Sequence, residues 1–282
     1  MDEEKKWEDR TNADFNTGDF SPCLEWLELQ GLRQRVKNVS QQLDAVFHKI
    51  IAEHEQRKGR CSAEEEDEER HKDLVDVLVD TEITLKNKKA ILMDMFVDGV
   101  ETTATTSEWI MSELVANPHV MKRLQEEIDF AARKNEKIKL SNIATMDYLH
   151  CVVKETFRLH PISPLLIPHE SMESCIVEGP HHHYSIPKKT RIVINDWAIG
   201  RDPSVWEDPL EFRPERFVGK YFDITIDPDL RIVPFRTGRR VFPSVSMAIA
   251  NIEIALVHLV NYFNWRSKEE LDMNESFGST IP

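Results

Sequence analysis

Four short motifs, in a fixed order, constrain the fold of this 282-residue chain more than any other feature. They are Phe96-Val-Asp-Gly-Val-Glu-Thr-Thr103, Lys154-Glu-Thr-Phe-Arg-Leu-His-Pro161, Phe212-Arg-Pro-Glu-Arg-Phe217 and Val233-Pro-Phe-Arg-Thr-Gly-Arg-Arg-Val-Phe-Pro-Ser-Val-Ser246. Each motif alone is weak evidence. Residues three apart are neighbours on any helix, for example, so a Glu and an Arg at that spacing form a commonplace ion pair. Their joint occurrence, in this order and spacing, leaves little room for chance.

Together the motifs resemble those of the cytochrome P-450 family of haem-thiolate monooxygenases, and the chain is identified as a plant-type member. The resemblance implies a mainly α fold with a small β region, the cytochrome P-450 fold, here N-terminally truncated. We expect residues 1–282 to form a single partial domain, the C-terminal portion of the family fold. The segment 19–31 resembles the loop that enters the long helix over the substrate pocket. The elements that precede this loop in the family, including the membrane anchor, are therefore expected to be absent.

The last motif resembles the family's haem-binding loop, Phe-x-x-Gly-x-Arg-x-Cys-x-Gly. Phe235, Gly238 and Arg240 fall on that pattern. With His169 they are the expected cofactor-binding residues, since His169 and Arg240 match positions that hold the haem propionates by charge-assisted hydrogen bonds. The family's ligand cysteine would stand at position 242, where this chain has Phe242. A cysteine thiolate favours O–O cleavage, whereas a phenyl ring has no lone pair for iron, so no metal ligand is predicted.

Three other positions depart from the family pattern. Arg236 replaces a usual glycine, and Ser244 replaces the glycine two residues after the ligand position. Glycine permits unusual backbone dihedral angles and a close approach to the ring, so we expect these side chains to crowd the loop. Asp98 stands where the family has alanine or glycine, and a carboxylate next to an apolar ring is costly unless it is paired or protonated.

The resemblance also implies roles for residues outside the loop. Glu101 and Thr102 match the acid and the hydroxyl that deliver protons to bound oxygen in a local opening of the central helix. The alternative is a helix-interior threonine and a surface glutamate. Glu155, Arg158 and Arg216 resemble the family's buried charge network, which has a structural role. Removing one member of such a network costs about 3–5 kcal/mol.

The pattern of apolar residues is mostly helical. Apolar residues recur at three- and four-residue steps between Leu32 and Ile51, which predicts one apolar stripe. A helix from about Lys88 to Asn117 is apolar on more than one face, as a buried helix is, and Pro118 marks its end or the start of the next helix. Further helices are predicted over residues 120–134, 146–159 and 247–263. Between residues 167 and 195, β-branched runs separated by turn residues predict a small sheet.

Charge and cysteine content exclude several classes of function. The net charge of −14 argues against nucleic acid as a partner. The acidic run at 63–70 is read as a solvated loop, with a docking site as the alternative, and the triple histidine at 181–183 as a turn insertion, with weak metal binding as the alternative. The cysteines lack metal-ligand spacing and fit a reducing compartment; they are Cys23, Cys61, Cys151 and Cys175.

No run of about 18 apolar residues is seen, and the N-terminus is charged rather than signal-like. The family resides on the cytosolic face of the endoplasmic reticulum membrane. Without an anchor, this chain is expected to be cytosolic or peripheral.

Three functional hypotheses remain open. The first is a monooxygenase that inserts one oxygen atom from O2 into a small hydrophobic metabolite, with electrons from an NADPH-dependent flavoprotein reductase. Apolar segments at 162–166 and 276–280, which resemble substrate-contacting segments, suit such a substrate. The second is a haem-free relative that serves as a small-molecule or protein-binding scaffold. The third is a truncated copy without function. Phe242 at the ligand position favours the hypotheses in which this chain does not catalyse the monooxygenase reaction.

Overall fold

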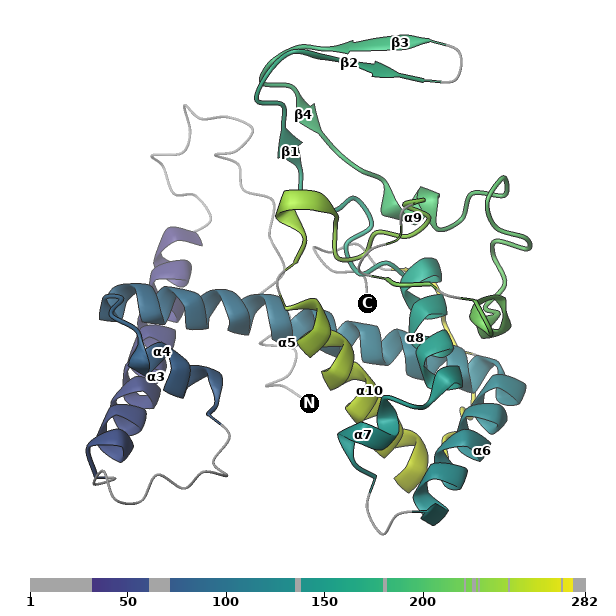
Figure 1. Cartoon of the computed structure of the whole chain (residues 1–282), viewed down its shortest axis with the longest axis horizontal. Helices are drawn as coiled ribbons and strands as arrows, with labels where there is room; N and C mark the ends of the chain where they lie inside the picture. The colour runs from purple at the N-terminus through teal and green to yellow at the C-terminus, as the bar shows by residue number, and fades with distance from the viewer. Residues whose placement is uncertain are drawn as a thin grey trace. The chain divides into compact units, whose positions relative to one another are not determined.

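The computed structural model describes residues 32–60, 72–134, 138–179, 182–220, 222–224, 227, 229–242, 244–269 and 271–275 (Figure 1). Cys23, Cys61 and His181 lie outside the described residues, as do the expected loop at 19–31, the acidic run at 63–70 and the segment 276–280. The chain divides into two compact units, residues 1–100 and 101–282.

The first unit contains α3 (Leu32–Arg60), α4 (Leu74–Asp80) and the beginning of α5 (Leu85–Ala116). Its small core is formed by Phe47, Ile51, Leu78 and Leu92. The predicted apolar stripe of the first helix is only partly buried, because α4 packs against the later turns of α3, whereas Val36, Val39 and Val46 are exposed. The prediction of a helix is therefore confirmed, but no described element covers the whole stripe.

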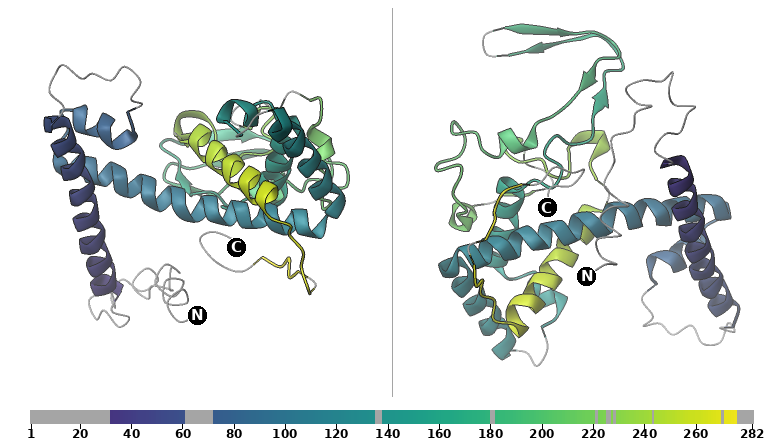
Figure 2. Two further views of the ribbon diagram at one scale, coloured as in Figure 1. Left: turned by 90° about the horizontal axis from the view of Figure 1, so that it is seen from below. Right: turned by 180° about the vertical axis from the view of Figure 1, so that it is seen from behind.

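The second unit is built around four helices that share one hydrophobic core. They are the later part of α5, α6 (Pro118–Lys134), α8 (Asp147–Leu159) and α10 (Val245–Tyr262), with the short α7 (Leu140–Ile143) beside them. Pro118 is the first residue of α6, where its missing N–H would be unpaired in any case. Val120, Leu124 and Ile128 recur every four residues of α6, and all three are fully buried. α10 packs against α6, α7 and α8 (Figure 2).

The predicted β region is confirmed as two separate two-stranded antiparallel sheets. β1 (His169–Glu170) pairs with β4 (Arg191–Ile192), and β2 (Cys175–Glu178) pairs with β3 (His183–Ile186). In the second sheet Cys175 faces Ile186 and Glu178 faces His183. Every residue of β2 is exposed, and the hairpin extends away from the helices of its unit (Figure 1).

Short elements lead from the sheets to the last motif. α9 (Asp196–Ile199) is followed by two 3-10 helices, η2 (Pro214–Phe217) and η3 (Gly238–Arg240). η2 packs closely on α8. This packing brings the third motif against the second, which are 50 to 60 residues apart in the chain.

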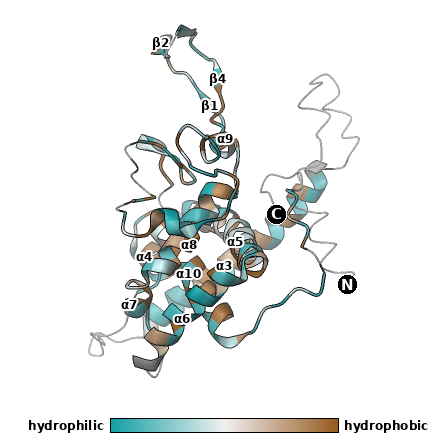
Figure 3. Cartoon of the chain, turned by 90° about the vertical axis from the view of Figure 1, so that its right-hand side faces the viewer, coloured by the Kyte–Doolittle hydropathy of each residue, from teal (hydrophilic) through white to brown (hydrophobic). Residues whose placement is uncertain are grey.

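By length and composition, α10 could cross a membrane, although no continuous run of about 18 apolar residues was expected from the sequence. The two statements agree, because this helix includes Asn251 and the buried Glu253 among its apolar residues and is therefore not a continuous apolar run. About a third of α10 (33%) is buried inside the structure. The helices of this unit carry both hydrophobic and hydrophilic residues (Figure 3).

Candidate functional site

The loop that follows Val233 is closed by its own backbone. The amide of Phe242 donates to the carbonyl of Phe235 at 3.0 Å, and the amide of Arg236 donates to the carbonyl of Val233 at 2.9 Å. The ring of Phe235 meets the ring of Phe157 on α8 edge-on, with 5.1 Å between centroids. The loop is therefore anchored to the core at its first aromatic residue and returns to the same point at Phe242.

Two residues of this loop have left-handed backbone conformations. Arg236 has a φ of 63° and Gly238 a φ of 67°. A Cβ on Gly238 would meet nothing within 4 Å, so the dihedral angle and not the space requires glycine there. An L-residue in this region costs about 1–2 kcal/mol. Arg236 therefore carries backbone strain in addition to the bulk that the sequence analysis expects.

The other expected cofactor-binding residues lie on separate elements. Arg240 ends η3, and its side chain lies outside the described part of the structure. His169 is half-buried at the start of β1, where its backbone pairs with Ile192. Phe242 is half-buried, and Ser244 precedes α10 as its N-cap without a capping hydrogen bond from its side chain.

The central helix has no opening at the expected catalytic pair. α5 is α-helical from Leu85 to Ala116 and runs without a break through Glu101 and Thr102. The Thr106 hydroxyl donates to the carbonyl of Thr102 at 2.7 Å, one turn back along the same helix. Glu101 is exposed and Thr102 is half-buried, while the fully buried hydroxyls of this segment belong to Thr105 and Thr106. Asp98 is also exposed, so its carboxylate is not desolvated here.

Glu155, Arg158 and Arg216 form a buried charge network. Arg158 donates Nε and one Nη to the two oxygens of Glu155 at 2.9 and 2.8 Å, and Arg216 donates Nε to Oε1 at 2.9 Å. The amide of Arg213 adds a fourth hydrogen bond to this carboxylate at 2.8 Å. All three side chains are almost fully buried. Two cations thus share one anion inside the protein, and backbone carbonyls must satisfy their remaining N–H groups.

Arg158 connects α8 to three later points of the chain. Its remaining N–H groups donate to the carbonyls of Gly200, Pro209 and Glu211 at 2.7, 2.7 and 2.9 Å. All five of its N–H donors are then used. Gly200 packs so closely that an added Cβ would lie 2.2 Å from the backbone oxygen of Arg158. Glycine at 200 is therefore required by contact with α8.

Two buried polar groups were not singled out from the sequence. A hydrogen bond of 2.7 Å joins His160 Nε2 to Oε1 of Glu113. The imidazole ring also stacks on the ring of Trp109, with 3.9 Å between centroids. Asp196 accepts from the amide of Val233 at 3.0 Å, and burial raises the pKa of this carboxyl to about 6. Its other oxygen has no partner among the described residues. Asp196 lies outside the four motifs, and His160 lies within the second motif but has no role expected from it, so only the fold reveals their burial.

One group of potential metal ligands is found among the described residues, in the first unit. His54 Nε2 lies 3.1 Å from Asp73 and 3.9 Å from Asp76. Asp73 and Asp76 also form the capping box that starts α4. Because His54 Nδ1 donates to the carbonyl of Ile50 as well, helix capping and one partly exposed ion pair account for this arrangement.

Comparisons with known proteins agree with the motifs described above. The model of the family described as Cytochrome P450 matches residues 6–281. "Cytochrome P450 750A1" from Pinus taeda is 42% identical over 285 residues, covering 95% of this chain and 53% of the relative. "Flavonoid 3',5'-hydroxylase 2" from Petunia hybrida is 39% identical and covers 95% and 53%, respectively. The chain thus spans about half the length of these relatives.

Solved structures agree with this similarity. A zebra fish cytochrome P450 determined with progesterone superposes with a TM-score of 0.70 at 29% sequence identity. The match covers 88% of this chain and 56% of that structure. The mainly helical arrangement described above is therefore similar to part of a known fold.

Proposed function

The chain belongs to the cytochrome P450 family, and from this premise we propose that it is a plant-type relative of the haem monooxygenases whose own turnover is impaired. The observation that carries the proposal is Phe242 at the position of the axial cysteine. In the family, haem held by a cysteine thiolate supplies the activation of dioxygen. Phe242 offers iron no lone pair.

The geometry of the loop supports this reading. Phe242 is fixed in place by the hydrogen bond from its amide to Phe235. Cys151 is buried on α8 and Cys175 is exposed on β2, so neither belongs to the loop. The residues present do not fit haem as the family holds it.

The rest of the inherited framework belongs to the same proposal. His169, Phe235, Gly238 and Arg240 would be remnants of the haem contact, and Glu101 and Thr102 of the proton-delivery pair. The Glu155 network would keep its structural role, since its hydrogen bonds are complete. Both units would be parts of a single cytochrome P-450 domain.

The names of two relatives support a substrate class. By their names, one relative hydroxylates flavonoids, and another, from Prunus mume and 38% identical, is a monooxygenase of phenylacetaldehyde oxime. The ancestral substrate of this chain would be a similarly small hydrophobic metabolite. An NADPH-dependent flavoprotein reductase would supply electrons.

The test is a haemin titration followed by the carbon monoxide difference spectrum of the reduced protein. Wild type, Phe242→Cys and Phe263→Cys are compared, because Phe263 is an exposed phenylalanine outside the loop. We expect no thiolate-type Soret band for wild type or Phe263→Cys. For Phe242→Cys we expect modestly tighter haemin binding and no oxygenated product with reductase and NADPH, because Arg236 and Ser244 still occupy glycine positions.

The first of two results would overturn the proposal, and the second would restrict the cause of the impairment to one residue. A thiolate-type spectrum from wild type would mean that another group ligates the iron. Oxygenated product from Phe242→Cys would mean that Phe242 alone prevents turnover.

A haem-free binding scaffold is the second candidate. It is favoured by the complete hydrogen bonding of the buried charge network, which a chain without any folded role would have no reason to retain. Cooperative unfolding of haem-free protein is expected of a scaffold, and a broad, non-cooperative transition is expected of a functionless copy.

A further inference from the structure

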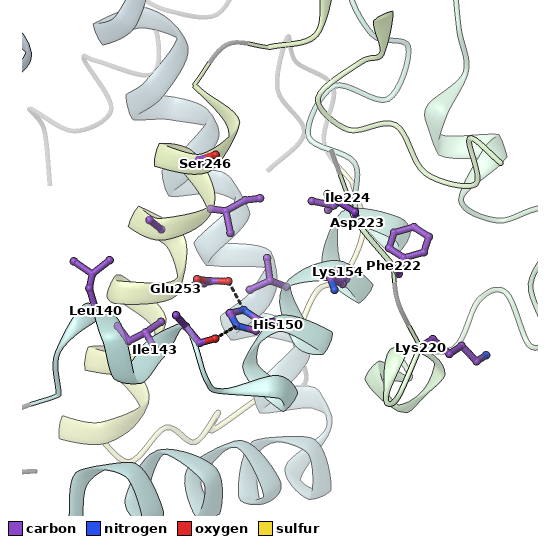
Figure 4. A pocket seen from close by; sticks show the side chains of 14 residues that line it. Leu140, Ile143, His150, Lys154, Lys220, Phe222, Asp223, Ile224, Ser246 and Glu253 are labelled. Atoms are coloured by element: carbon purple, nitrogen blue, oxygen red, sulfur yellow. Dashed lines mark hydrogen bonds and ion pairs between the residues drawn. The ribbon is translucent and has the colours of Figure 1, made fainter. Parts of the chain in front are cut away.

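A pocket of about 590 Å³ lies in the second unit between α7, α8, α10 and the segment around residues 220–224 (Figure 4). Pockets that hold small organic molecules usually have volumes of about 300–1,000 Å³. All four elements belong to one unit, so the shape of the pocket is set within that unit.

Two opposite walls of the pocket are apolar. α7 and α10 form one wall, and the segment after Lys220 forms the other (Figure 4). The apolar side chains that define them are Leu140, Ile143, Ile249 and Ala250 on one side and Phe222 and Ile224 on the other. A flat or branched hydrophobic body would be in contact with protein on both faces.

The polar pair inside the pocket neutralises itself. His150 of α8 meets Glu253 of α10 at 2.6 Å, and the pair is drawn at the centre of Figure 4. The hydrogen bond to Glu253 raises the pKa of His150, while burial opposes this rise. The rise favours the cationic imidazole, whose charge offsets that of the carboxylate at 2.6 Å.

The remaining charges in the pocket favour an anion. Lys154 lies one turn after His150 on α8, half-buried, and Lys220 lies at the exposed rim. Neither ammonium makes an ion pair or hydrogen bond to any part of the chain that the structure describes. The one other acidic residue of the lining is Asp223. The Lys154 side chain is half-buried and has no counter-ion among the described residues, so an anion beside it would be stabilising.

We propose that this pocket binds an amphipathic organic acid, with its apolar body between α7 and Phe222 and its acid group at Lys154. Lys220 adds a second positive charge at the entrance. The proposal rests on the geometry of the second unit and does not depend on the loss of turnover at Phe242. A neutral ligand of the same shape would gain the apolar contacts only, and a cation would face two ammonium groups.

The experiment uses two dyes of matched shape. 1-Anilinonaphthalene-8-sulfonate is an apolar anion, and N-phenyl-1-naphthylamine is its neutral analogue. Both are titrated by fluorescence into haem-free wild type, Lys154→Gln, Ala250→Phe and Lys122→Gln. Lys122 is an exposed lysine of α6 outside the pocket, and its variant is the matched control for charge.

Lys154→Gln is expected to weaken binding of the sulfonate about fivefold and to leave the neutral dye unchanged, as for loss of one partly exposed ion pair. Ala250→Phe fills the pocket and should weaken both dyes. Lys122→Gln should change neither. Since Lys154 is half-buried at the surface, its variant is expected to fold even if Ala250→Phe does not.

Equal affinity of the sulfonate for wild type, Lys154→Gln and Lys122→Gln would overturn the proposal. It would mean that the dye binds to exposed apolar surface elsewhere on the chain. Weakening of the neutral dye by Lys154→Gln would also contradict it, because that result would show a change in shape and not the loss of a charge.

Discussion

Asp196 is a side chain whose ionisation opposes folding. It is almost fully buried, accepts one hydrogen bond from Val233 and has one oxygen without a described partner. Burial raises its pKa from an ordinary value of 3.8 to about 6. Below pH 3.8 the carboxyl is neutral in both states, so it costs nothing. As the pH rises towards 6 the unfolded chain loses this proton first, and the stability contributed by this group falls.

Asp196→Asn is therefore expected to stabilise the protein at pH 7. The amide keeps an acceptor for Val233 and carries no charge, so the gain is at most about 3 kcal/mol, from a shift of about two pKa units. Urea unfolding of both proteins at pH 4 and at pH 7 measures it. The difference should be small at pH 4 and largest above pH 6.

Asp202→Asn is the matched control on the same segment. Asp202 is half-buried, and hydrogen bonds from Ser204 lower the pKa of its carboxyl. Its stabilising effect is present above the unfolded pKa and is lost as the pH falls, so its variant should be slightly less stable than wild type at pH 7. A gain in stability from Asp202→Asn, or none from Asp196→Asn, would contradict this account.

Arg236 offers a second test at the same scale. Its φ of 63° favours glycine, so Arg236→Gly should stabilise the chain by about 0.5–1 kcal/mol after the greater flexibility of glycine in the unfolded state is included. Gly238→Ala places an alanine at a φ of 67° and should lose about 1 kcal/mol. The midpoints of thermal unfolding compare the two. Equal midpoints for Arg236→Gly and wild type would show that the loop relaxes without strain.

At the scale of elements, α8 is the helix on which the second unit depends. Ten of its thirteen residues are buried, including the charged Glu155 and Arg158. A helix buried on so many faces can carry charge only where each group is paired. The second and third motifs meet at this helix, which explains why they occur together in the sequence.

Glu155→Gln is expected to destabilise the protein by about 3–5 kcal/mol, because two buried guanidinium groups lose their shared anion. Chemical unfolding measures the loss. Glu126→Gln on α6 is the control, since Glu126 forms an exposed pair with Lys122 at 4.0 Å and should change stability by less than about 0.5 kcal/mol. Similar losses from both variants would mean that burial of the network has no energetic importance.

The sequence predicts elements and motif contacts better than it predicts single buried polar groups. The helices expected over 88–117 and 146–159 are α5 and α8, nearly to the residue. The contact of Glu155 with Arg158 and Arg216 could be anticipated, because all three residues lie in motifs whose family resemblance implies a charge network. Asp196 and His160 could not be anticipated, because their partners lie 37 and 47 residues away without any pattern between them. The opening expected in α5 is wrong for this structure, because the helix stays regular through Thr102.

At the scale of the whole molecule, apolar side chains on α5 remain at the surface. Val97 and Val100, three residues apart on one face, are each 56% exposed, and Phe96 beside them is 48% exposed. Grouped apolar side chains at a surface promote association, even for a chain with a net charge of −14.

The purified chain is therefore expected to associate as its concentration rises. Val97→Lys combined with Val100→Lys should shift the distribution towards monomer in sedimentation velocity. Val205→Lys is the control, as Val205 is an exposed valine on a turn far along the chain from α5. A monodisperse monomer with a sharply cooperative unfolding transition would show that the expectation of association is wrong.

The guanidinium group of Arg158 also has a consequence for the order in which the chain folds. Its carbonyl partners lie 42, 51 and 53 residues later in the sequence. The ion pair with Glu155 is local and can form as soon as α8 does, but the other three bonds require long loops to close first. Arg158 is thus only partly paired until the segment from Gly200 to Glu211 has docked. We expect this docking to occur late in folding, and once complete it should lower the rate of unfolding.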